Sequence, residues 1–183
     1  MKMMRPQQGN TLLDVGCGTG YFSRRFVDKG LVVTSLDLEP AMINYAQTQT
    51  TRVNYVNGSA EQLPFADNSF DYCTAITSLC FVDDPKKALT EMWRVNQRGV
   101  ALGLLNRNSL LYRQKSGLGR YAGARWNVRK SVKKWISALK LGPARIQHKT
   151  AIFFPDGDRL ARLAEMWLPS RLLFGGFLAI YIK

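Results

Sequence analysis

Three glycines and two aspartates are the residues of this chain whose types and spacing best suit ligand binding. The segment Asp14-Val15-Gly16-Cys17-Gly18-Thr19-Gly20 follows a short apolar run, and Asp37 ends the next apolar run. Glycine permits a tight turn and leaves room for a ligand where a Cβ would stand in the way. A carboxylate one strand–helix–strand unit later can accept hydrogen bonds from the ribose hydroxyls of an adenosine. The pair favours an adenosine-containing ligand over an ordinary glycine turn beside a surface aspartate.

The spacing of the glycines separates two classes of ligand. A dinucleotide-binding loop has the pattern GxGxxG, which would place its third glycine at position 21. This chain has Tyr21 there and Gly20 before it, so its pattern is GxGxG. A pyrophosphate-binding loop, and with it an NAD-dependent oxidoreductase, is therefore the weakest alternative.

Alternating strands and helices are expected to position these residues. Strand patterns cover residues 11–15, 31–36, 53–56, 71–77, 100–105, 146–154 and 177–182. Helix patterns cover residues 21–29, 40–47, 84–95, a segment that Asn127 caps and Gly142-Pro143 ends, and a segment around 160–167. Such alternation forms βαβ units, whose ligands bind beyond the carboxyl ends of the strands. We predict one α/β domain over residues 1–183: a doubly wound, mostly parallel seven-stranded sheet with helices on both faces and an antiparallel last strand.

Charge is distributed unevenly along the chain. Its 183 residues include 26 Lys and Arg against 13 Asp and Glu, a net charge of +13. Residues 1–99 hold ten of each sign, whereas residues 107–149 hold twelve basic residues and no acidic one. A local excess of this kind indicates a surface that faces an anionic partner, or a solvated basic face. We therefore divide the domain into a neutral half, residues 10–99, and a basic half, residues 100–183.

The cysteines and apolar runs limit the class of protein. Cys17, Cys73 and Cys80 are odd in number, lack CxxC spacing and lie in apolar runs. This predicts reduced packing residues of a cytoplasmic protein, with no disulfide framework and no metal site. The first residues lack the apolar stretch of a signal peptide. The longest apolar run, residues 172–182, is shorter than the ~18 residues of a membrane span.

Three sequence blocks in the same order resemble the class I S-adenosylmethionine-dependent methyltransferases. They are Leu12-Leu13-Asp14-Val15-Gly16-Cys17-Gly18-Thr19-Gly20, Leu36-Asp37-Leu38-Glu39-Pro40-Ala41-Met42, and residues 58–71 with the sequence GSAEQLPFADNSFD. The third block resembles the small-molecule branch that includes the quinone-biosynthesis methyltransferases. The resemblance covers residues 10–105 and implies a Rossmann-like methyltransferase fold, S-adenosylmethionine as the cofactor, and methyl transfer to a small acceptor. It also implies that the neutral residues 10–99 form the cofactor-binding half and that the basic residues 100–183 form the acceptor-side half.

The resemblance also implies a role for individual residues by their position in the blocks. Gly16, Cys17 and Gly18 would line the methionine part of the cofactor, with Asp14 supporting its amino end. Asp37 would hold the ribose, with Leu38 and Met42 against the adenine. Ser59, Ala60 and Glu61 would edge the adenine ring, and Thr77 and Ser78 would face the methyl donor.

Two departures from the family pattern affect this site. Ser59 stands where the family usually has aspartate, which weakens the hydrogen bond to the adenine amino group or leaves it to the backbone. About ten residues precede the first strand, where the family has a helical segment that covers the cofactor. We expect an open pocket, a pocket completed by a second copy of the chain, or a shortened form.

Residues 106–125 are expected to recognise the acceptor, because they follow the fifth strand and are longer than a typical connection. Their basic groups could pair with a carboxylate or phosphate, and their rings could stack on a flat acceptor. The candidates, with the residue that follows, are Arg107, Tyr112, Arg113, Tyr121, Arg125 and Trp126. The alternative is a disordered basic loop with its aromatic residues in the core.

The sequence predicts no strong catalytic base, because alignment of the acceptor with the methyl group supplies much of the catalysis of an in-line displacement. Asp83 is the weak candidate, whereas Asp84 suits a helix cap and His148 a surface position. Thr77-Ser78-Leu79-Cys80-Phe81 lacks the Asn/Asp-Pro-Pro-aromatic motif of enzymes that methylate base amino groups. The leading hypothesis is methyl transfer to a small anionic or aromatic molecule, with nucleic acid not favoured. An RNA- or membrane-associated methyltransferase and a non-catalytic cofactor-binding module remain open.

Overall fold

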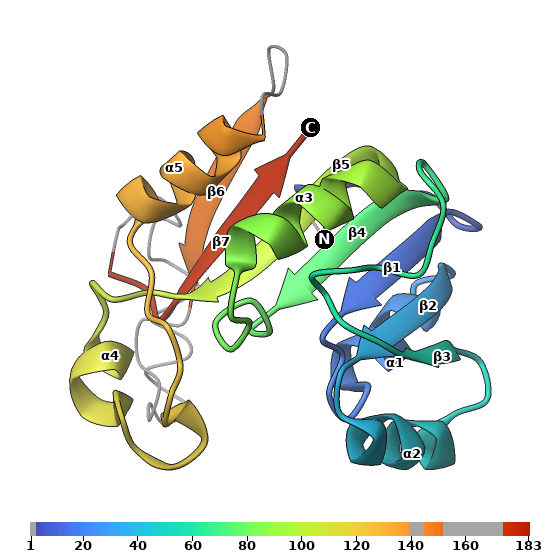
Figure 1. The fold of residues 1–183 in the computed structure, drawn as a ribbon, viewed down its shortest axis with the longest axis horizontal. Helices are drawn as coiled ribbons and strands as arrows, with labels where there is room; N and C mark the ends of the chain where they lie inside the picture. The colour runs from blue at the N-terminus through green and yellow to red at the C-terminus, as the bar shows by residue number, and fades with distance from the viewer. Residues whose placement is uncertain (1–2, 140–144, 152–173) are drawn as a thin grey trace.

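Seven strands form one mixed sheet in the computed structural model, which describes residues 3–139, 145–151 and 174–183 (Figure 1). The strands are β1 (Thr11–Val15), β2 (Val32–Asp37), β3 (Asn54–Asn57), β4 (Phe70–Ile76), β5 (Asn96–Leu105), β6 (Ile146–Ala151) and β7 (Phe177–Ile182). Their order across the sheet is β3-β2-β1-β4-β5-β7-β6. The first five strands are parallel, and β7 lies antiparallel between β5 and β6. The predicted sheet, with its antiparallel last strand, is confirmed.

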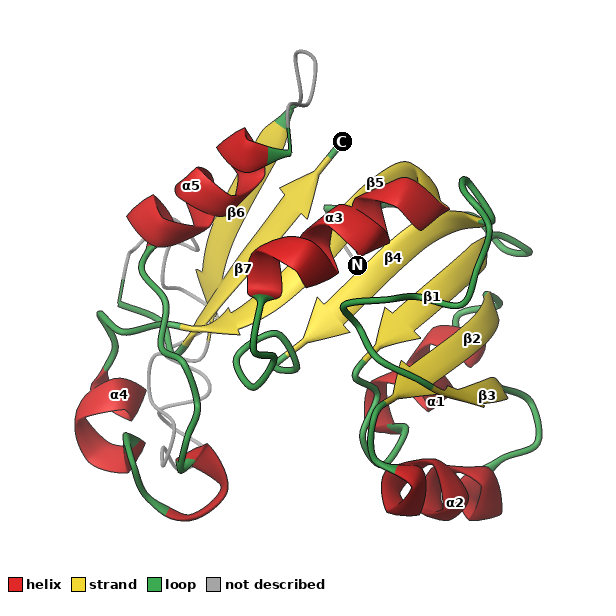
Figure 2. Cartoon of the chain, in the orientation of Figure 1, coloured by secondary structure: helices red, strands yellow, loops and turns green. Residues whose placement is uncertain are grey.

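Helices cover both faces of this sheet (Figure 2). They are α1 (Tyr21–Val27), α2 (Pro40–Gln49), α3 (Pro85–Val95), α4 (Leu110–Lys115), the 3₁₀ helix η1 (Gly119–Tyr121) and α5 (Arg129–Ala138). Figure 1 shows α3 and α5 on one face and α1 on the other. Asp84 caps α3 as predicted, since its carboxylate accepts the N–H groups of Lys86 at 2.9 Å and Lys87 at 3.1 Å.

Two apolar layers hold the helices against the sheet. On one face, Leu89 and Met92 of α3 and Val132 and Ile136 of α5 are buried against residues of β4, β5 and β7. On the other face, buried residues of the N-terminal segment, α1 and the strands form a second cluster, which includes Met4, Phe26, Val33, Tyr72 and Tyr181. The sheet is thereby fixed on both sides, and the loops at its carboxyl edge are free to build a site.

The structure corrects the prediction at the start of one helix, in one connecting segment and at the start of one strand. The N-cap of α5 is Val128 and not Asn127, because the Asn127 amide donates to the Arg125 carbonyl oxygen at 3.1 Å and so fixes the preceding loop. Residues 106–125, which the sequence predicts as a long connection, contain α4, which Ser109 caps, and η1. Strand β5 begins at Asn96 and not at residue 100, because Asn96 and Gly99 also pair with β4, through a register shift. The helix predicted around 160–167 and residues 152–154 of the sixth strand lie outside the described residues.

In the part of the chain that the structure describes, no helix combines the length and apolar character needed to cross a membrane.

Candidate functional site

The glycine loop between β1 and α1 folds back over the end of β2. The N–H groups of Gly16 and Cys17 both donate to the Leu36 carbonyl oxygen, at 2.7 and 3.1 Å. Gly16 and Gly18 have φ angles of 71° and 53°, in the left-handed region that glycine adopts without steric cost. The backbone of the loop therefore comes to lie beside Asp37, the last residue of β2.

Asp37 is bound to the glycine loop through its side chain. Its Oδ2 accepts the N–H of Gly18 at 2.7 Å, and its Oδ1 accepts the N–H of Glu39 at 3.0 Å. A carboxylate oxygen has two lone pairs, so each oxygen keeps the capacity to accept one more hydrogen bond. The two residues that the sequence paired are brought together, and the carboxylate can still accept two ribose hydroxyls.

Gly16 also has no room for a side chain. A Cβ at this position would lie 2.2 Å from the Cβ of Ser78. Ser78 donates through its Oγ to the Val15 carbonyl oxygen at 2.6 Å, and so joins the loop after β4 to the end of β1. The contact brings Ser78 against the glycine loop, and its predicted position facing the methyl donor stays a prediction.

Replacing Gly16 by alanine is expected to lower the free energy of unfolding by about 3 kcal/mol, because overpacking against Ser78 adds to the strain of a left-handed alanine. The matched control is Gly18→Ala, whose Cβ would meet nothing within 4 Å and which carries the strain alone. Urea denaturation compares the two variants. Equal losses of stability would show that Ser78 moves aside and does not constrain the loop.

Asp14 is a buried carboxylate behind the loop, with an exposed fraction of 2%. The hydroxyls of Ser23 and Thr74 donate to it at 2.7 and 3.1 Å, and no lysine or arginine of the described residues forms an ion pair with it. Burial raises its pKa to about 6, although the two hydrogen bonds act in the opposite direction. A buried carboxylate without a cation fits the ammonium group of a bound methionine moiety.

Apolar side chains next to Asp37 are left uncovered. Leu38 is 71% exposed and Met42, in the first turn of α2, is 40% exposed. Exposed apolar side chains of this size, beside a carboxylate that could accept ribose hydroxyls, could pack against the faces of an adenine ring. Leu38 and Met42 are therefore accessible to a ligand, and their contact with adenine stays a prediction.

The residues predicted to edge the adenine follow β3 and are partly engaged elsewhere. The Ser59 hydroxyl accepts the N–H of Glu61 at 3.2 Å, and the Glu61 carboxylate accepts the N–H of Asp84 at 2.9 Å. Ala60 is partly buried against the larger core. In the structure the Glu61 side chain holds the loop before α3, so its contribution at an adenine would come from its backbone.

Cys17 and the residues after β4 show what chemistry the protein itself can offer. Burial raises the pKa of the Cys17 thiol to about 12, so the group stays protonated at neutral pH and is no nucleophile. Thr77 has a φ of 60°, which is rare for a β-branched residue, and its N–H donates to Gly103 at 2.7 Å. Asp83 is exposed. In the described residues no group of three His, Cys, Asp or Glu side chains could hold a metal ion.

The predicted acceptor residues gather into an aromatic and basic cluster below the ends of β4 and β5. The rings of Tyr112 and Tyr121 pack against Trp126, with centroids 5.2 and 5.7 Å apart, and the Arg107 guanidinium lies 5.9 Å from the Tyr112 ring. Arg125 donates to the carbonyl oxygens of Val82 and Asp83. Arg113 is exposed on α4 and takes no part in these contacts.

A cavity of about 480 Å³ opens beside this cluster, between the first turns of α3 and α5. Its lining residues are Asp84, Pro85, Lys86, Arg107, Arg125, Trp126, Asn127, Val128, Ser131 and Trp135. Three of them are cationic, and the single acid, Asp84, is already bound to α3. The Trp126 Nε1 atom is buried without a hydrogen-bond partner in the described residues. A buried donor without an acceptor costs free energy that a ligand oxygen would recover.

Comparisons with known proteins agree with this geometry. The model of the methyltransferase domain family matches residues 13–103. A malonyl-[acyl-carrier protein] O-methyltransferase of Serratia marcescens is 41% identical over 50% of this chain and 36% of its own length. A demethylmenaquinone methyltransferase of Renibacterium salmoninarum is 43% identical over 50% of this chain and 38% of its own length. The chain belongs to the class I S-adenosylmethionine-dependent methyltransferases.

Solved structures extend the likeness of this methyltransferase domain to the whole fold. A methyltransferase of Thermotoga maritima superposes with a TM-score of 0.73 at 24% identity, covering 99% of this chain and 84% of that one. A methyltransferase of Mesorhizobium loti superposes with a TM-score of 0.74 at 16% identity, covering 99% of this chain and 94% of that one. The chain spans well under half the length of the curated relatives named above. The family's cofactor is S-adenosylmethionine, and the geometry of Asp14, Asp37 and the glycine loop fits it.

The sequence did not predict the hydroxyl partners of Asp14 or seven of the ten residues that line the 480 Å³ cavity. Ser23 and Thr74 are buried polar residues among apolar neighbours, and this position could have indicated that they have a buried hydrogen-bond partner. Lys86, Ser131 and Trp135 come from two helix starts that only the fold brings together.

Proposed function

We propose that this methyltransferase domain transfers a methyl group from S-adenosylmethionine to a small acceptor that carries an anionic group. The observation that carries the proposal is the tie between Asp37 and Gly18, which holds a ribose-binding carboxylate against a glycine loop. When bound, S-adenosylmethionine supplies an electrophilic methyl group on a sulfonium. Gly16, Gly18 and Asp14 would hold its methionine part, Asp37 its ribose, and Leu38 and Met42 its adenine.

The protein's part in the reaction would be alignment. Ser78 is fixed to the end of β1, and Thr77 is held in a left-handed conformation at the end of β4. Two rigid backbone segments would therefore face the reacting groups from one side. Orientation of this kind contributes about 7–11 kcal/mol to lowering a reaction barrier, so no strong base is required.

The charge of the 480 Å³ cavity supports an acidic acceptor. Arg107 and Lys86 have no ion pair with a described residue, and Trp126 offers a buried N–H. Arginine pairs well with carboxylates and phosphates. Of the two relatives, one acts on a malonyl group, which ends in a carboxylate, and the other on a quinone-type ring. The three cationic side chains of the cavity favour the acidic acceptor over the quinone-type ring.

The test is transfer of labelled methyl from S-adenosylmethionine to a panel that includes a malonyl thioester and a demethylated menaquinol. We expect S-adenosylhomocysteine to form with the acid and not with the ring. No turnover across the panel, with cofactor bound, would favour a non-catalytic binding module.

Replacing Arg107 by glutamine is expected to raise the KM for the acidic acceptor by about tenfold, the effect of losing one charge-assisted hydrogen bond. The dissociation constant of S-adenosylmethionine should not change. Lys130→Gln, on the exposed side of α5, removes the same charge outside the cavity and should leave both constants unaltered. A change in cofactor affinity with an unchanged KM would place Arg107 outside the acceptor site.

A further inference from the structure

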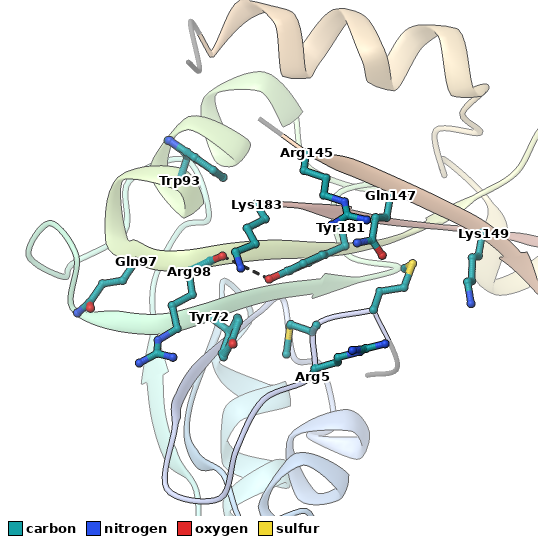
Figure 3. A pocket seen from close by; sticks show the side chains of 12 residues that line it. Arg5, Tyr72, Trp93, Gln97, Arg98, Arg145, Gln147, Lys149, Tyr181 and Lys183 are labelled. Carbon is teal, nitrogen blue, oxygen red and sulfur yellow. Dashed lines mark hydrogen bonds between the residues drawn. The ribbon is translucent and has the colours of Figure 1, made fainter. Parts of the chain in front are cut away.

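A second cavity, of about 810 Å³, lies at the edge of the sheet opposite the glycine loop (Figure 3). Its walls are the N-terminal segment, the starts of β4, β5 and β6 and the end of β7. The lining residues are Met3, Met4, Arg5, Tyr72, Trp93, Gln97, Arg98, Arg145, Gln147, Lys149, Tyr181 and Lys183. Because parallel strands start at the edge opposite their carboxyl ends, this cavity is separate from the proposed cofactor and acceptor sites.

Strand register aligns the polar side chains of this cavity in a row. Gln147 pairs with Tyr181 and Lys149 with Ala179 in the antiparallel ladder, and Arg145 extends it through two backbone hydrogen bonds with Lys183. Residues two apart on a strand share a face and lie about 6.8 Å apart. Arg145, Gln147 and Lys149 therefore project from β6 and its start into one space.

The charge of the cavity is one-sided. None of the lining residues is Asp or Glu, and five are Lys or Arg. Arg98 contacts the Asp71 carboxylate at 2.7 Å, but Arg5, Arg145 and Lys149 have no ion pair with a described residue. Like charges that share a cavity repel one another, and a bound anion with several charges would relieve this repulsion.

The size and floor of the cavity limit the kind of anion. Its volume falls within the roughly 300–1,000 Å³ of small-molecule sites. The floor is made by Tyr72 and Tyr181, which are 6% and 3% exposed, and Tyr181 donates its hydroxyl to the Arg98 carbonyl oxygen at 3.3 Å. Rings buried to this extent offer little surface on which nucleic-acid bases could stack. Two guanidinium groups, an ammonium and an amide suit phosphate oxygens.

We infer that this cavity is a second binding site, for a small molecule that carries several phosphate charges. The site is formed by β6, the end of β7 and the N-terminal segment, and its occupancy does not depend on the methyl transfer proposed above. Arg145 and Lys149 would be its principal anion-binding residues, with Arg5 closing it from the opposite wall (Figure 3).

The test is calorimetric titration of the full chain with inorganic tripolyphosphate at low ionic strength. We expect binding that weakens as salt is added, and an affinity at least about tenfold lower in the double variant Arg145→Gln, Lys149→Gln. The matched control, Lys133→Gln, Lys134→Gln, removes the same charge from exposed positions on α5 and should bind as the unmodified chain does. Thermal denaturation of both variants checks that each is folded.

Several outcomes would overturn the inference. They are the absence of tripolyphosphate binding, and an equal loss of affinity in both double variants, which would indicate net charge alone. Citrate binding as tight as that of tripolyphosphate would show that the cavity does not select phosphate. Binding of a short single-stranded RNA that depends on Arg145 and Lys149, without binding of tripolyphosphate, would make the surface a nucleic-acid site instead.

Discussion

Replacing Asp37 by alanine is expected to lower the affinity for S-adenosylmethionine by about 100-fold. The substitution removes the proposed acceptor of two ribose hydroxyls and also the 2.7 Å hydrogen bond that holds Gly18. Hydrogen bonds to a charged group contribute about 1.5–3 kcal/mol each. The loss of two such bonds therefore corresponds to about 3 kcal/mol or more, which is at least two powers of ten in the dissociation constant. Titration calorimetry with S-adenosylmethionine and with S-adenosylhomocysteine measures the effect.

Two further variants separate the ribose contact from the loop contact. Asp37→Asn keeps an oxygen that can accept the Gly18 N–H, so its affinity should lie between those of the unmodified chain and the alanine variant. Asp28→Ala removes an exposed carboxylate whose partner is Arg52, and it should bind the cofactor normally. If Asp37→Ala binds with undiminished affinity, Asp37 does not hold the ribose.

The cofactor side of the site could be predicted because it lies on contiguous motifs. Gly16 and Gly18 are needed locally for a turn, and Asp37 ends the neighbouring parallel strand, so the fold brings them together through one βαβ unit. In an α/β sheet this proximity follows from the order of the elements alone. A reader of the sequence needs only the boundaries of these elements. Those of β1 were predicted to the residue, and α3 follows its predicted cap, Asp84, and ends at Val95 as predicted.

The acceptor side and the opposite cavity could be predicted only in part, because they depend on contacts between distant segments. Arg125 is fixed by carbonyl oxygens 42 and 43 positions earlier, and nothing in the local sequence shows this. Arg145 and Lys149 looked like part of a general basic stretch. They share a face because they alternate along one strand, which is seen only once the segment pairs with β7. The distribution of charge along the sequence indicated the basic half of the domain, but it did not indicate the 810 Å³ cavity.

Asp14 gives the second large prediction, because its substitution should change stability and cofactor affinity in opposite directions. Burial raises its pKa from 3.8 to about 6 in the folded chain. Between these two pH values the folded state binds the proton that the unfolded state has released, so stability falls as pH rises through this window. Above this pH window the ionised carboxylate lowers the free energy of unfolding by about 3 kcal/mol, because each unit of pKa shift corresponds to about 1.36 kcal/mol.

Asp14→Asn is therefore expected to raise the free energy of unfolding by about 1–3 kcal/mol at pH 7.5, where the original carboxylate is ionised, and by much less at pH 4. The gain is below the full electrostatic cost because the amide must rearrange its hydrogen bonds with Ser23 and Thr74. Urea denaturation at the two pH values measures the difference.

Asp71→Asn is the control for the direction of the change in the free energy of unfolding. Burial tends to raise the pKa of Asp71, but the Thr11 N–H and the Arg98 guanidinium outweigh it and hold the pKa below its ordinary value. A lowered carboxyl pKa stabilises the fold above the unfolded pKa, and this stabilisation is lost as pH falls. Asp71→Asn should therefore destabilise the chain at pH 7.5, opposite to Asp14→Asn.

Cofactor binding tests whether the buried charge of Asp14, which lowers the stability of the apoprotein, serves to bind S-adenosylmethionine. If its charge attracts the methionine ammonium, Asp14→Asn should weaken S-adenosylmethionine binding by about tenfold at pH 7.5 even as the apoprotein becomes more stable. The affinity of the unmodified chain should also fall as pH drops through about 6, the pKa that burial gives Asp14, and that of the variant should not. Stability and affinity that fall together would instead make Asp14 a purely structural residue. Opposite changes would mean that folding accepts an unfavourable charge because the cofactor neutralises it.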